Sequence, residues 1–276
     1  MLTDEEFRLF RNLIYEESGI YLKETRMDFL ENRVVKRLQA TGLTSPYWYY
    51  KRLTEQNKAE LLVLLDLLTV NETSFFRNGP QIELFKNIVL PAIMRNKTRE
   101  ARKQLRIWSA GCSTGEEPYT VAMIIRDTLL DPKPWEIKIF ASDLSFTALK
   151  AASAGEYNFD KVSATVDDHY INRYFEKTGD RVRIKDELKK MVIFDYSNLK
   201  NNNGLTGLDV IFCRNVMIYF DDEVQTRLVK RFYDILNPGG YLFLGHAESL
   251  HGTGTKFEFV YDNKGTAYKK PEEVLV

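Results

Sequence analysis

The sequence predicts an α/β fold with a mostly parallel sheet, preceded by an all-helical domain and interrupted by a small inserted β-subdomain. In the first part of the chain, apolar residues recur at helical spacing throughout. Farther along, short apolar segments alternate with helical patterns, which favours a parallel sheet with helices on both faces. We therefore divide the 276 residues into a helical domain (1–70), a linker and helix (71–104) and an α/β domain (105–276), with the insertion over about 156–190.

The helical domain begins with a capping pattern. Thr3 and Glu6 match a capping box, in which each residue satisfies a backbone N–H of the other. The helix that follows should end at Gly19, because glycine readily adopts the left-handed conformation found after helices. Further helices are expected over Glu24–Ala40, from Ser45-Pro46 onward, and over Lys58–Leu68.

In the α/β domain, strand candidates are separated by helices. The strands are expected at 105–110, 137–143, 191–195, 208–213 and 237–245. The helices should cover about Glu117–Leu130, about ten residues through Leu149, and Asp221–Leu236. Antiparallel edge strands are expected at 257–261 and 266–270. Within the insertion, the stretch F-E-K-T-G-D-R-V-R-I predicts a hairpin around Thr178-Gly179-Asp180.

The bulk composition excludes several functional classes. The chain has 39 basic and 39 acidic residues, so no net field draws it to nucleic acid or to anionic lipid. No apolar run is long enough for a membrane span, and the acidic start M-L-T-D-E-E-F lacks the apolar core of a secretory signal. The 2 cysteines and 3 histidines have no metal-ligand spacing. We expect a cytoplasmic monomer with reduced thiols, no metal, no nucleic-acid partner and no membrane insertion.

A glycine loop follows the first strand candidate and allows two interpretations. Gly111-Cys112-Ser113-Thr114-Gly115 matches G-x-S-x-G, the nucleophile elbow of serine hydrolases, and His246 could complete such a site. The same loop could instead cradle a cofactor at the carboxyl end of the sheet. The next strand ends in Ser142-Asp143, where nucleotide-binding folds place a carboxylate that accepts both ribose hydroxyls. This carboxylate favours the cofactor cradle.

The residues after the loop bear on which cofactor it holds. Glu116 and Glu117 begin the helix where a pyrophosphate would otherwise sit, and their charge repels phosphate but favours a cation. S-adenosylmethionine carries a sulfonium and an ammonium group and no phosphate, so the charges favour it over NAD. Both glutamates could equally serve only to complement the helix macrodipole, and that alternative stays open.

Several motifs then occur in order along the chain. They are N-E-T-S-F-F-R (71–77), A-G-C-S-T-G-E-E-P-Y (110–119), F-A-S-D (140–143), S-N-L (197–199), F-C-R-N-V-M-I-Y-F (212–220) and P-G-G-Y-L-F-L-G-H-A-E (238–248). The ordered set resembles the CheR family of S-adenosylmethionine-dependent methyltransferases, which esterify glutamate side chains of bacterial chemotaxis receptors. The resemblance spans nearly the whole chain. It implies a Rossmann-like methyltransferase domain behind the helical domain.

The resemblance also implies which side chains meet the cofactor and the acceptor. The residues that would line the cofactor pocket are Asn71, Thr73, Arg77, Gly111, Glu117, Asp143, Asn198, Leu199, Arg214 and Asn215. Arg77 and Tyr219 would lie nearest to the transferring methyl group and hold the acceptor carboxylate. Ordinary roles stay open for several of them: helix caps for Asn71 and Thr73, and a core position for Tyr219.

The second predicted helix carries a basic stripe. Arg26, Arg33 and Arg37 recur at helical spacing with Lys36 beside them, next to an apolar stripe that should face the core. A solvated face with internal ion pairs would give the same pattern. By resemblance, the stripe is a docking surface for the acidic receptor helices around the methylation sites.

One departure and two rival functions complete the expectations. Family members that use a short tethering peptide have a longer glycine-rich loop in the inserted subdomain, so the short hairpin here favours direct docking on the receptor. A hydrolase that uses Ser113 and a sensor that binds the cofactor without catalysis remain as rivals. Methylation of RNA or of a small molecule is disfavoured by the neutral charge and by Arg214-Asn215 where such enzymes carry an N-P-P-Y-type motif.

Overall fold

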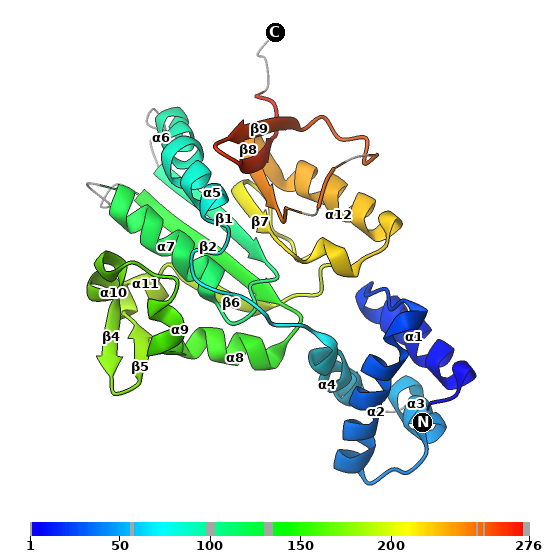
Figure 1. Cartoon of the computed structure of the whole chain (residues 1–276). Helices are drawn as coiled ribbons and strands as arrows, with labels where there is room; N and C mark the ends of the chain where they lie inside the picture. Colours follow the sequence, from blue (N-terminus) through cyan, green and yellow to red (C-terminus); the bar gives the residue numbers. More distant parts are fainter. Residues whose placement is uncertain are drawn as a thin grey trace.

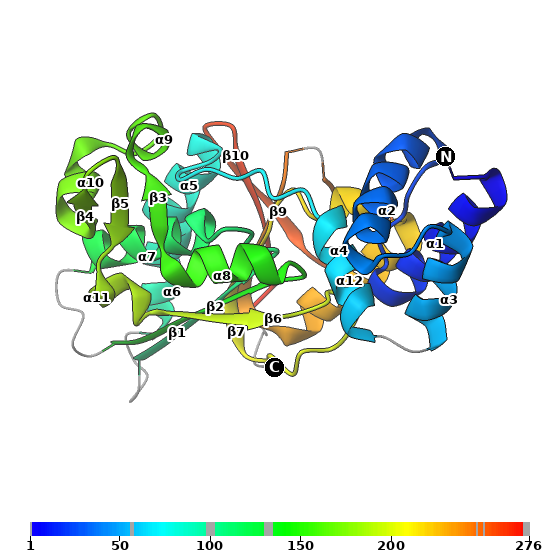
Figure 2. The same cartoon turned by 90° about the horizontal axis from the view of Figure 1, so that it is seen from below.

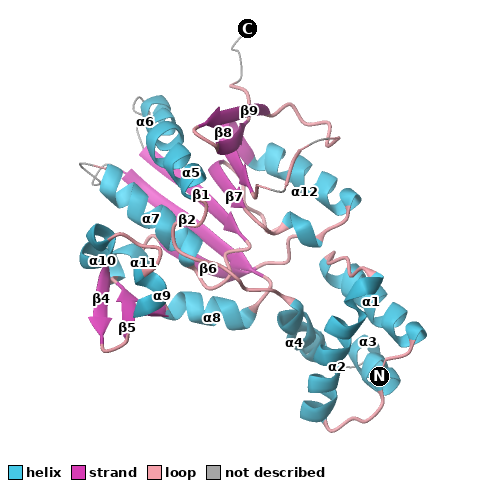
Figure 3. Cartoon of the chain, viewed as in Figure 1, coloured by secondary structure: helices cyan, strands magenta, loops and turns pink. Residues whose placement is uncertain are grey.

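The computed structural model, shown in Figure 1, describes residues 2–55, 58–97, 103–129, 135–246, 248–250 and 252–272. The described residues form a helical bundle, an open sheet with helices on both of its faces, and a small second sheet (Figure 3). The α/β fold class with a preceding helical domain is therefore confirmed.

The helical bundle has its own apolar core. It consists of α1 (Asp4–Ser18), the short 3-10 helix η1 (Glu24–Arg26), α2 (Met27–Thr41), α3 (Pro46–Glu55) and α4 (Lys58–Leu68). The capping box is confirmed, since the Thr3 backbone N–H donates to the Glu6 carboxylate at 2.9 Å and the Glu6 N–H donates back to Thr3 Oγ1 at 3.2 Å. Gly19 ends α1 in the left-handed conformation, with φ of 77°. Phe10 and Leu64 are fully buried between the helices.

The large sheet contains 7 strands in the order β6-β2-β1-β7-β8-β10-β9. Their bounds are β1 (Lys103–Ala110), β2 (Trp135–Asp143), β6 (Val192–Tyr196), β7 (Leu208–Cys213), β8 (Leu236–Leu244), β9 (Glu258–Asp262) and β10 (Gly265–Lys269). The strands from β6 to β8 pair in parallel, and β10 and β9 are antiparallel at one edge, as the sequence predicts. Every residue of β7 is buried, which is typical of a parallel strand covered on both faces.

Helices cover the two faces of this sheet. A nearly continuous helical stretch crosses it after the linker: α5 (Gly79–Leu84), a π-helical turn η2 (Phe85–Val89) and α6 (Leu90–Lys97). The remaining helices that cover the sheet are α7 (Glu116–Thr128), α8 (Phe146–Ala154) and α12 (Asp222–Ile235). The helix of about ten residues predicted through Leu149 is confirmed as α8. The following residues are mostly alanine, the strongest helix former, and the helix continues until Gly155 adopts a φ of 60°.

The strand order places a crevice in the sheet. After β1 the chain moves outward through β2 to β6, whereas β7 and β8 lie on the opposite side of β1. Connections therefore leave β1 and β7 in opposite directions, and a gap opens beyond their carboxyl ends. The helical bundle lies beyond these same strand ends in both views (Figures 1 and 2).

The insertion forms the second sheet, with strand order β3-β5-β4. It contains β3 (Glu156–Asn158), α9 (Phe159–Ser163), α10 (Asp168–Tyr174), β4 (Phe175–Thr178), β5 (Arg181–Ile184) and α11 (Asp186–Lys189). The predicted hairpin is confirmed, because Thr178 pairs with Arg181 across a tight turn.

Polar contacts on both sides of the crevice join the helical bundle to the α/β domain. On one side, the Tyr15 hydroxyl donates to Asp221 Oδ2 at 2.7 Å, and the Tyr21 N–H donates to the Tyr219 carbonyl at 2.8 Å. On the other side, the Thr147 hydroxyl donates to Asp66 Oδ2 at 2.6 Å. The bundle is thus attached to both walls of the crevice.

A buried ion pair joins three helices inside the bundle. Arg37 of α2 donates two hydrogen bonds to the Glu60 carboxylate of α4, at 2.8 and 2.9 Å. The Tyr49 hydroxyl of α3 donates to the same carboxylate at 2.8 Å. Burial alone would raise the pKa of Glu60, but the hydrogen bonds from Arg37 and Tyr49 outweigh it and hold that pKa below its ordinary value of 4.5. The carboxylate therefore stabilises the fold only while it is ionised.

We predict that Glu60→Gln lowers the free energy of unfolding by about 2–3 kcal/mol at pH 7, since breaking a buried pair leaves the Arg37 charge without its counterion. The pKa of Glu60 is lower in the folded chain, so its contribution is fully present above pH 4.5 and is lost as the pH falls through the folded pKa. Urea unfolding at a series of pH values should show the variant and the wild type converging in acid. Glu55→Gln, which removes an exposed i,i+4 pair with Lys51, is the control and should leave stability unchanged. An equal loss in both variants would contradict the assignment.

Candidate active site

A cleft lies between the helical bundle and the carboxyl ends of β1, β2 and β7. All the side chains that the family resemblance assigns to the cofactor line this cleft: Asn71, Thr73, Arg77, Gly111, Glu117, Asp143, Asn198, Leu199, Arg214 and Asn215. Tyr219 lines it as well. The helical bundle adds a wall that sequence reasoning missed, made of Ser18, Ile20, Leu68, Thr69 and Val70.

The glycine loop forms the floor of the cleft. It leaves β1 at Gly111 with a φ of 85°, and a Cβ there would lie 2.4 Å from a methyl group of Val216. Only glycine fits this close approach between the loop and the next wall. The Gly111 and Cys112 N–H groups both donate to the Ser142 carbonyl, at 2.8 and 2.9 Å, which fixes the loop to the end of β2.

Asp143 ends β2 and faces the loop. Its carboxylate accepts from the Ser113 N–H at 2.8 Å and from the Ser145 N–H at 2.9 Å. Burial raises the pKa of Asp143, and these backbone hydrogen bonds oppose the rise. A buried carboxylate at this strand end is the arrangement that binds ribose hydroxyls in nucleotide-binding folds.

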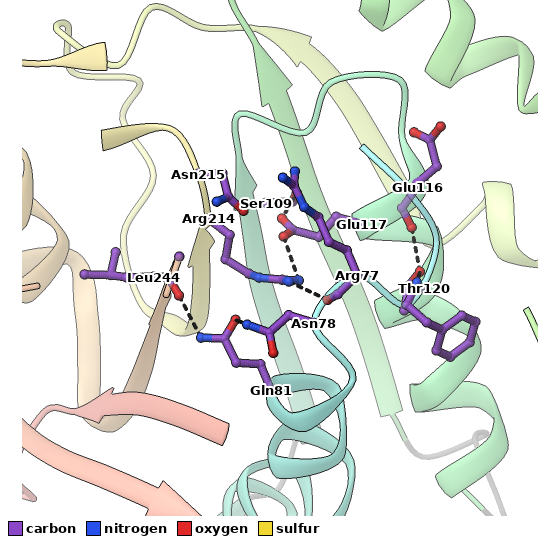
Figure 4. A network of polar contacts seen from close by, with 12 residues as sticks. Arg77, Asn78, Gln81, Ser109, Glu116, Glu117, Thr120, Arg214, Asn215 and Leu244 are labelled. Carbon is purple, nitrogen blue, oxygen red and sulfur yellow. Dashed lines mark hydrogen bonds and ion pairs between the residues drawn. The ribbon is translucent and has the colours of Figure 1, made fainter. Parts of the chain in front are cut away.

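Glu117 lies at the start of α7 in a second polar cluster, drawn in Figure 4. It accepts from the Ser109 hydroxyl at 2.7 Å and from Arg214 Nη1 at 3.4 Å. Burial raises the pKa of Glu117 and lowers that of Arg214, and the attraction between the two charges opposes both shifts. Arg214 also donates to the Arg77 carbonyl, and its Nε has no hydrogen-bond partner among the described residues.

These carboxylates fit one class of cofactor. Glu117 and Asp143 are both largely buried and both line the cleft, whereas Glu116 does not line it and accepts from the Thr114 hydroxyl. This donor set suits a ligand with an ammonium group and ribose hydroxyls, and it repels a pyrophosphate. S-adenosylmethionine meets both conditions. Glu117 would hold its methionine end and Asp143 its ribose.

Ser113 has no partner for hydrolytic chemistry in the described chain. Its hydroxyl lies 3.5 Å from Asn71 Oδ1, and no hydrogen bond joins it to a histidine there. Its backbone N–H binds Asp143, as a cofactor cradle requires. Over the described ranges, no group of His, Cys, Asp and Glu side chains gathers in a way that could hold a metal ion.

Two family models together match nearly the whole chain. The all-alpha domain of the CheR methyltransferases matches residues 5–69, and their S-adenosylmethionine-binding domain matches residues 71–266. The chain belongs to the CheR methyltransferase family. It is an S-adenosylmethionine-dependent methyltransferase, and neither the hydrolase nor the sensor interpretation is supported.

Named relatives of this family align over most of the chain. "Chemotaxis protein methyltransferase 2" of Vibrio cholerae is 35% identical over 278 residues, which cover 99% of this chain and 95% of the relative. The "Chemotaxis protein methyltransferase" of Salmonella typhimurium is 38% identical and that of Escherichia coli 37%, each over 93% of this chain and 88% of the relative.

In this CheR family member, Arg77 and Tyr219 both line the cleft. Arg77 is exposed, and its Nη1 donates to the Glu72 carbonyl at 2.9 Å. Tyr219 is half-buried at the end of a short 3-10 helix, η3 (Met217–Tyr219). Burial raises the pKa of Tyr219, while the charges of Arg26 and Arg77 oppose the rise, so both guanidinium groups lie within electrostatic reach of its hydroxyl.

Glu248 holds the loop that carries Tyr219, and sequence reasoning assigned it no role. Its carboxylate accepts from the backbone N–H groups of Gly245 at 2.5 Å, Asn215 at 3.1 Å and Ile218 at 3.2 Å. Asn215 needs this support because its φ is 60°, in the left-handed region. The signal was present in the sequence, since Glu248 is the last residue of the motif that runs from Pro238.

Asn198 and Leu199 line the cleft but also serve the domain junction. The Asn198 amide donates to the Glu17 carbonyl of α1 at 2.6 Å and accepts from the Lys200 N–H at 3.0 Å. Arg231 of α12 donates to the Leu199 carbonyl at 2.8 Å. The loop expected on the adenine side is therefore fixed by helices from both domains.

The basic stripe on α2 contains fewer available cations than the sequence suggested. Arg37 is engaged with Glu60 and only 20% of its side chain is exposed, so the interpretation of Arg37 as a docking residue is corrected: it is part of the bundle's internal ion pair. Arg33 stacks 3.7 Å above the Phe29 ring and is partly buried. Arg26 and Lys36 are exposed. Helical periodicity identified the face that points away from the core, but not the partner from the neighbouring helix.

We predict that Glu248→Ala lowers the free energy of unfolding by about 2–4 kcal/mol and weakens S-adenosylmethionine binding, because several backbone N–H groups lose their acceptor at once. Urea unfolding and titration calorimetry would measure the two effects. Glu258→Ala, which removes an exposed carboxylate from β9, is the control and should change neither quantity. A Glu248→Ala protein with wild-type stability and affinity would show that the loop does not depend on this carboxylate.

Proposed function

We propose that the protein methylates glutamate side chains in the cytoplasmic helical domain of chemotaxis receptors and forms glutamyl methyl esters. The observation that supports this most strongly is the position of Arg77 and Tyr219, a cation and a hydroxyl donor at the open rim of the cofactor cleft. Together they suit a carboxylate that enters from a second protein. The names of the relatives, chemotaxis protein methyltransferases, support the same substrate.

The reaction needs positioning more than acid–base catalysis. A glutamate side chain has an unperturbed pKa of about 4.3, so it arrives already ionised and needs no base. When bound, S-adenosylmethionine supplies an electrophilic methyl carbon: the carboxylate oxygen bonds to it, the carbon–sulfur bond breaks, and S-adenosylhomocysteine leaves with the electron pair. Arg77 and Tyr219 would hold the carboxylate in line with that methyl group. The surrounding apolar wall of the cleft would exclude water from the carboxylate.

Docking is proposed to use the exposed end of the basic stripe. Arg26 belongs to η1 beside the cleft and influences Tyr219 electrostatically, so a receptor helix that contacts Arg26 would pass close to the rim. Lys36 and the partly buried Arg33 extend the same positive surface along α2. Acidic receptor helices complement this charge. The short turn between Thr178 and Arg181 favours direct docking over capture of a tethering peptide.

The remaining assignments follow from this function. We propose that the enzyme acts in the cytoplasm, as a monomer and without a nucleic-acid partner. None of the helices in the described part of the chain has the length and apolar run that a bilayer crossing demands.

We predict that the protein transfers a radiolabelled methyl group from S-adenosylmethionine to receptor-containing membranes, and that alkali releases the label as methanol. A carboxyl methyl ester is labile to base, whereas an N-methyl group is not. Label that resists alkali would refute glutamate as the acceptor. Failure to label at all, despite cofactor binding, would refute the proposed substrate.

The matched variants for this assay are Arg77→Ala and Tyr219→Phe. Each should lower the rate of transfer at saturating cofactor by about tenfold or more, because each removes one group that aligns the acceptor. Arg95→Ala, which removes an exposed arginine from α6, should transfer at the wild-type rate. Wild-type turnover in both site variants would remove Arg77 and Tyr219 from the mechanism.

We also predict that charge reversal of Arg26 and Lys36 together raises the receptor KM by about tenfold or more while the affinity for S-adenosylmethionine stays unchanged. The increase should shrink as salt is added, since these side chains are exposed and screened. Lys230→Glu, an exposed reversal on α12, is the control. A receptor KM that stays at the wild-type value would mean that docking does not use α2.

A further inference from the structure

A tyrosine of the inserted subdomain contacts the glycine loop that forms the floor of the cofactor cleft. Tyr157 lies on β3, and its hydroxyl donates to the Thr114 carbonyl at 2.7 Å. Thr114 belongs to the glycine loop and follows Ser113, which lines the cleft. A residue of the insertion therefore binds the backbone of the loop that cradles the cofactor.

Thr114 is held at its side chain as well as at its backbone. Its hydroxyl donates to the Glu116 carboxylate at 2.7 Å, while its carbonyl accepts from Tyr157. Gly115 packs closely against α8 and the insertion, because a Cβ on Gly115 would lie 2.9 Å from Ala152 Cβ and 3.1 Å from the Tyr157 hydroxyl. The Tyr157 hydroxyl thus lies against two adjacent residues of the loop, Thr114 and Gly115.

The loop depends on such support because its backbone is strained. Ser113 has a φ of 49° and Gly115 a φ of 95°, both in the left-handed region. A serine is disfavoured in that region, so surrounding contacts must maintain the conformation. In this conformation the Ser113 N–H donates a hydrogen bond to the Asp143 carboxylate at 2.8 Å.

The ring of Tyr157 supports the opposite wall. Phe75, which is 3% exposed, contacts the Tyr157 ring edge-on with centroids 4.9 Å apart. Phe75 also contacts the Phe175 ring of β4 at 5.5 Å. It belongs to the linker that carries Thr73 and Arg77 on either side. The hydroxyl of Tyr157 therefore supports one wall of the cleft, and its ring supports the other.

We infer that Tyr157 is a positioning residue for cofactor binding, through which the inserted subdomain sets the geometry of both the glycine loop and the linker. This inference rests on the proposed cofactor residues of the cleft. Its consequence is that the insertion contributes to the affinity for the adenosyl sulfonium cofactor, in addition to any contact with the receptor.

The test compares two tyrosines of the same subdomain. Tyr157→Phe keeps the ring against Phe75 and removes only the hydroxyl that binds Thr114. Tyr174 lies on α10, no residue of which lines the cleft. Tyr174→Phe removes its hydroxyl, which donates to Asp127 at 3.2 Å. Calorimetric titration of each full-length protein with S-adenosylmethionine gives the dissociation constants. Hydrogen exchange of residues 111–119 reports on the loop directly.

Tyr157→Phe should weaken S-adenosylmethionine binding by about threefold to tenfold, the range expected for one hydrogen bond, and should speed exchange in the loop. Tyr174→Phe should bind within twofold of the wild type. Tyr157→Phe with wild-type affinity would overturn the inference, and so would an equal loss of affinity in both variants. A wild-type protein that binds no S-adenosylmethionine would instead refute the proposed cofactor, so the two failures are distinguishable.

Discussion

The reversal of strand order beside β1 is the constraint on which the rest of this structure depends. Parallel strands all end at the same edge, and the connections from β1 and β7 leave in opposite directions, so no helix crosses the gap between them. Several of the candidate site residues are therefore carried at or just after the ends of these strands. Asp143 ends β2, Glu117 lies at the start of the helix that follows β1, and Arg214 follows β7. The helical bundle closes the gap and supplies its remaining wall.

Burial at this edge makes the charges interdependent. Glu117 is buried beside Arg214, and the attraction between the two charges lowers the free energy of the ionised form of each. Removing one partner would leave the other charge unpaired in a low-dielectric site, which costs far more than the net gain from the pair. The same reasoning applies to Asp143, whose carboxylate is held by backbone N–H groups in place of a cation. The cleft can thus present carboxylates to a cationic ligand without a compensating metal.

The sequence predicted the parts of the site that depend on local order. Asp143 and Gly111 could be located because a strand end and a glycine loop are read within a few residues of each other. Contacts across the fold could not be predicted in this way. Tyr157 lies 43 residues from Thr114, Asn215 lies 33 residues from Glu248, and Tyr15 lies 206 residues from Asp221. Apolar periodicity shows that a side chain points away from the apolar face of its helix. Which residue that side chain contacts is decided by tertiary packing.

The same limitation explains the outcome for Arg37. Its helical spacing placed it on the solvent side of α2; this is correct for Lys36, and Arg26, in η1 just before α2, is exposed as well. The packing of α4 against that side brings Glu60 within 2.8 Å, and a cation that appeared free in the pattern becomes an internal contact. A basic stripe therefore gives an upper limit to the number of docking cations.

The domain junction would link the proposed docking surface to the proposed acceptor site. The Tyr219 carbonyl accepts from the Tyr21 N–H, so the residue proposed to hold the acceptor is fixed in part by the bundle that carries the proposed docking surface. Tyr21 and Arg26 belong to the same short segment between α1 and α2. A receptor helix bound to this segment would consequently be held by the same stretch of backbone that positions Tyr219. Alignment of a carboxylate with a methyl group tolerates little displacement, and a shared backbone support for docking and chemistry limits that displacement without requiring the two domains to move together.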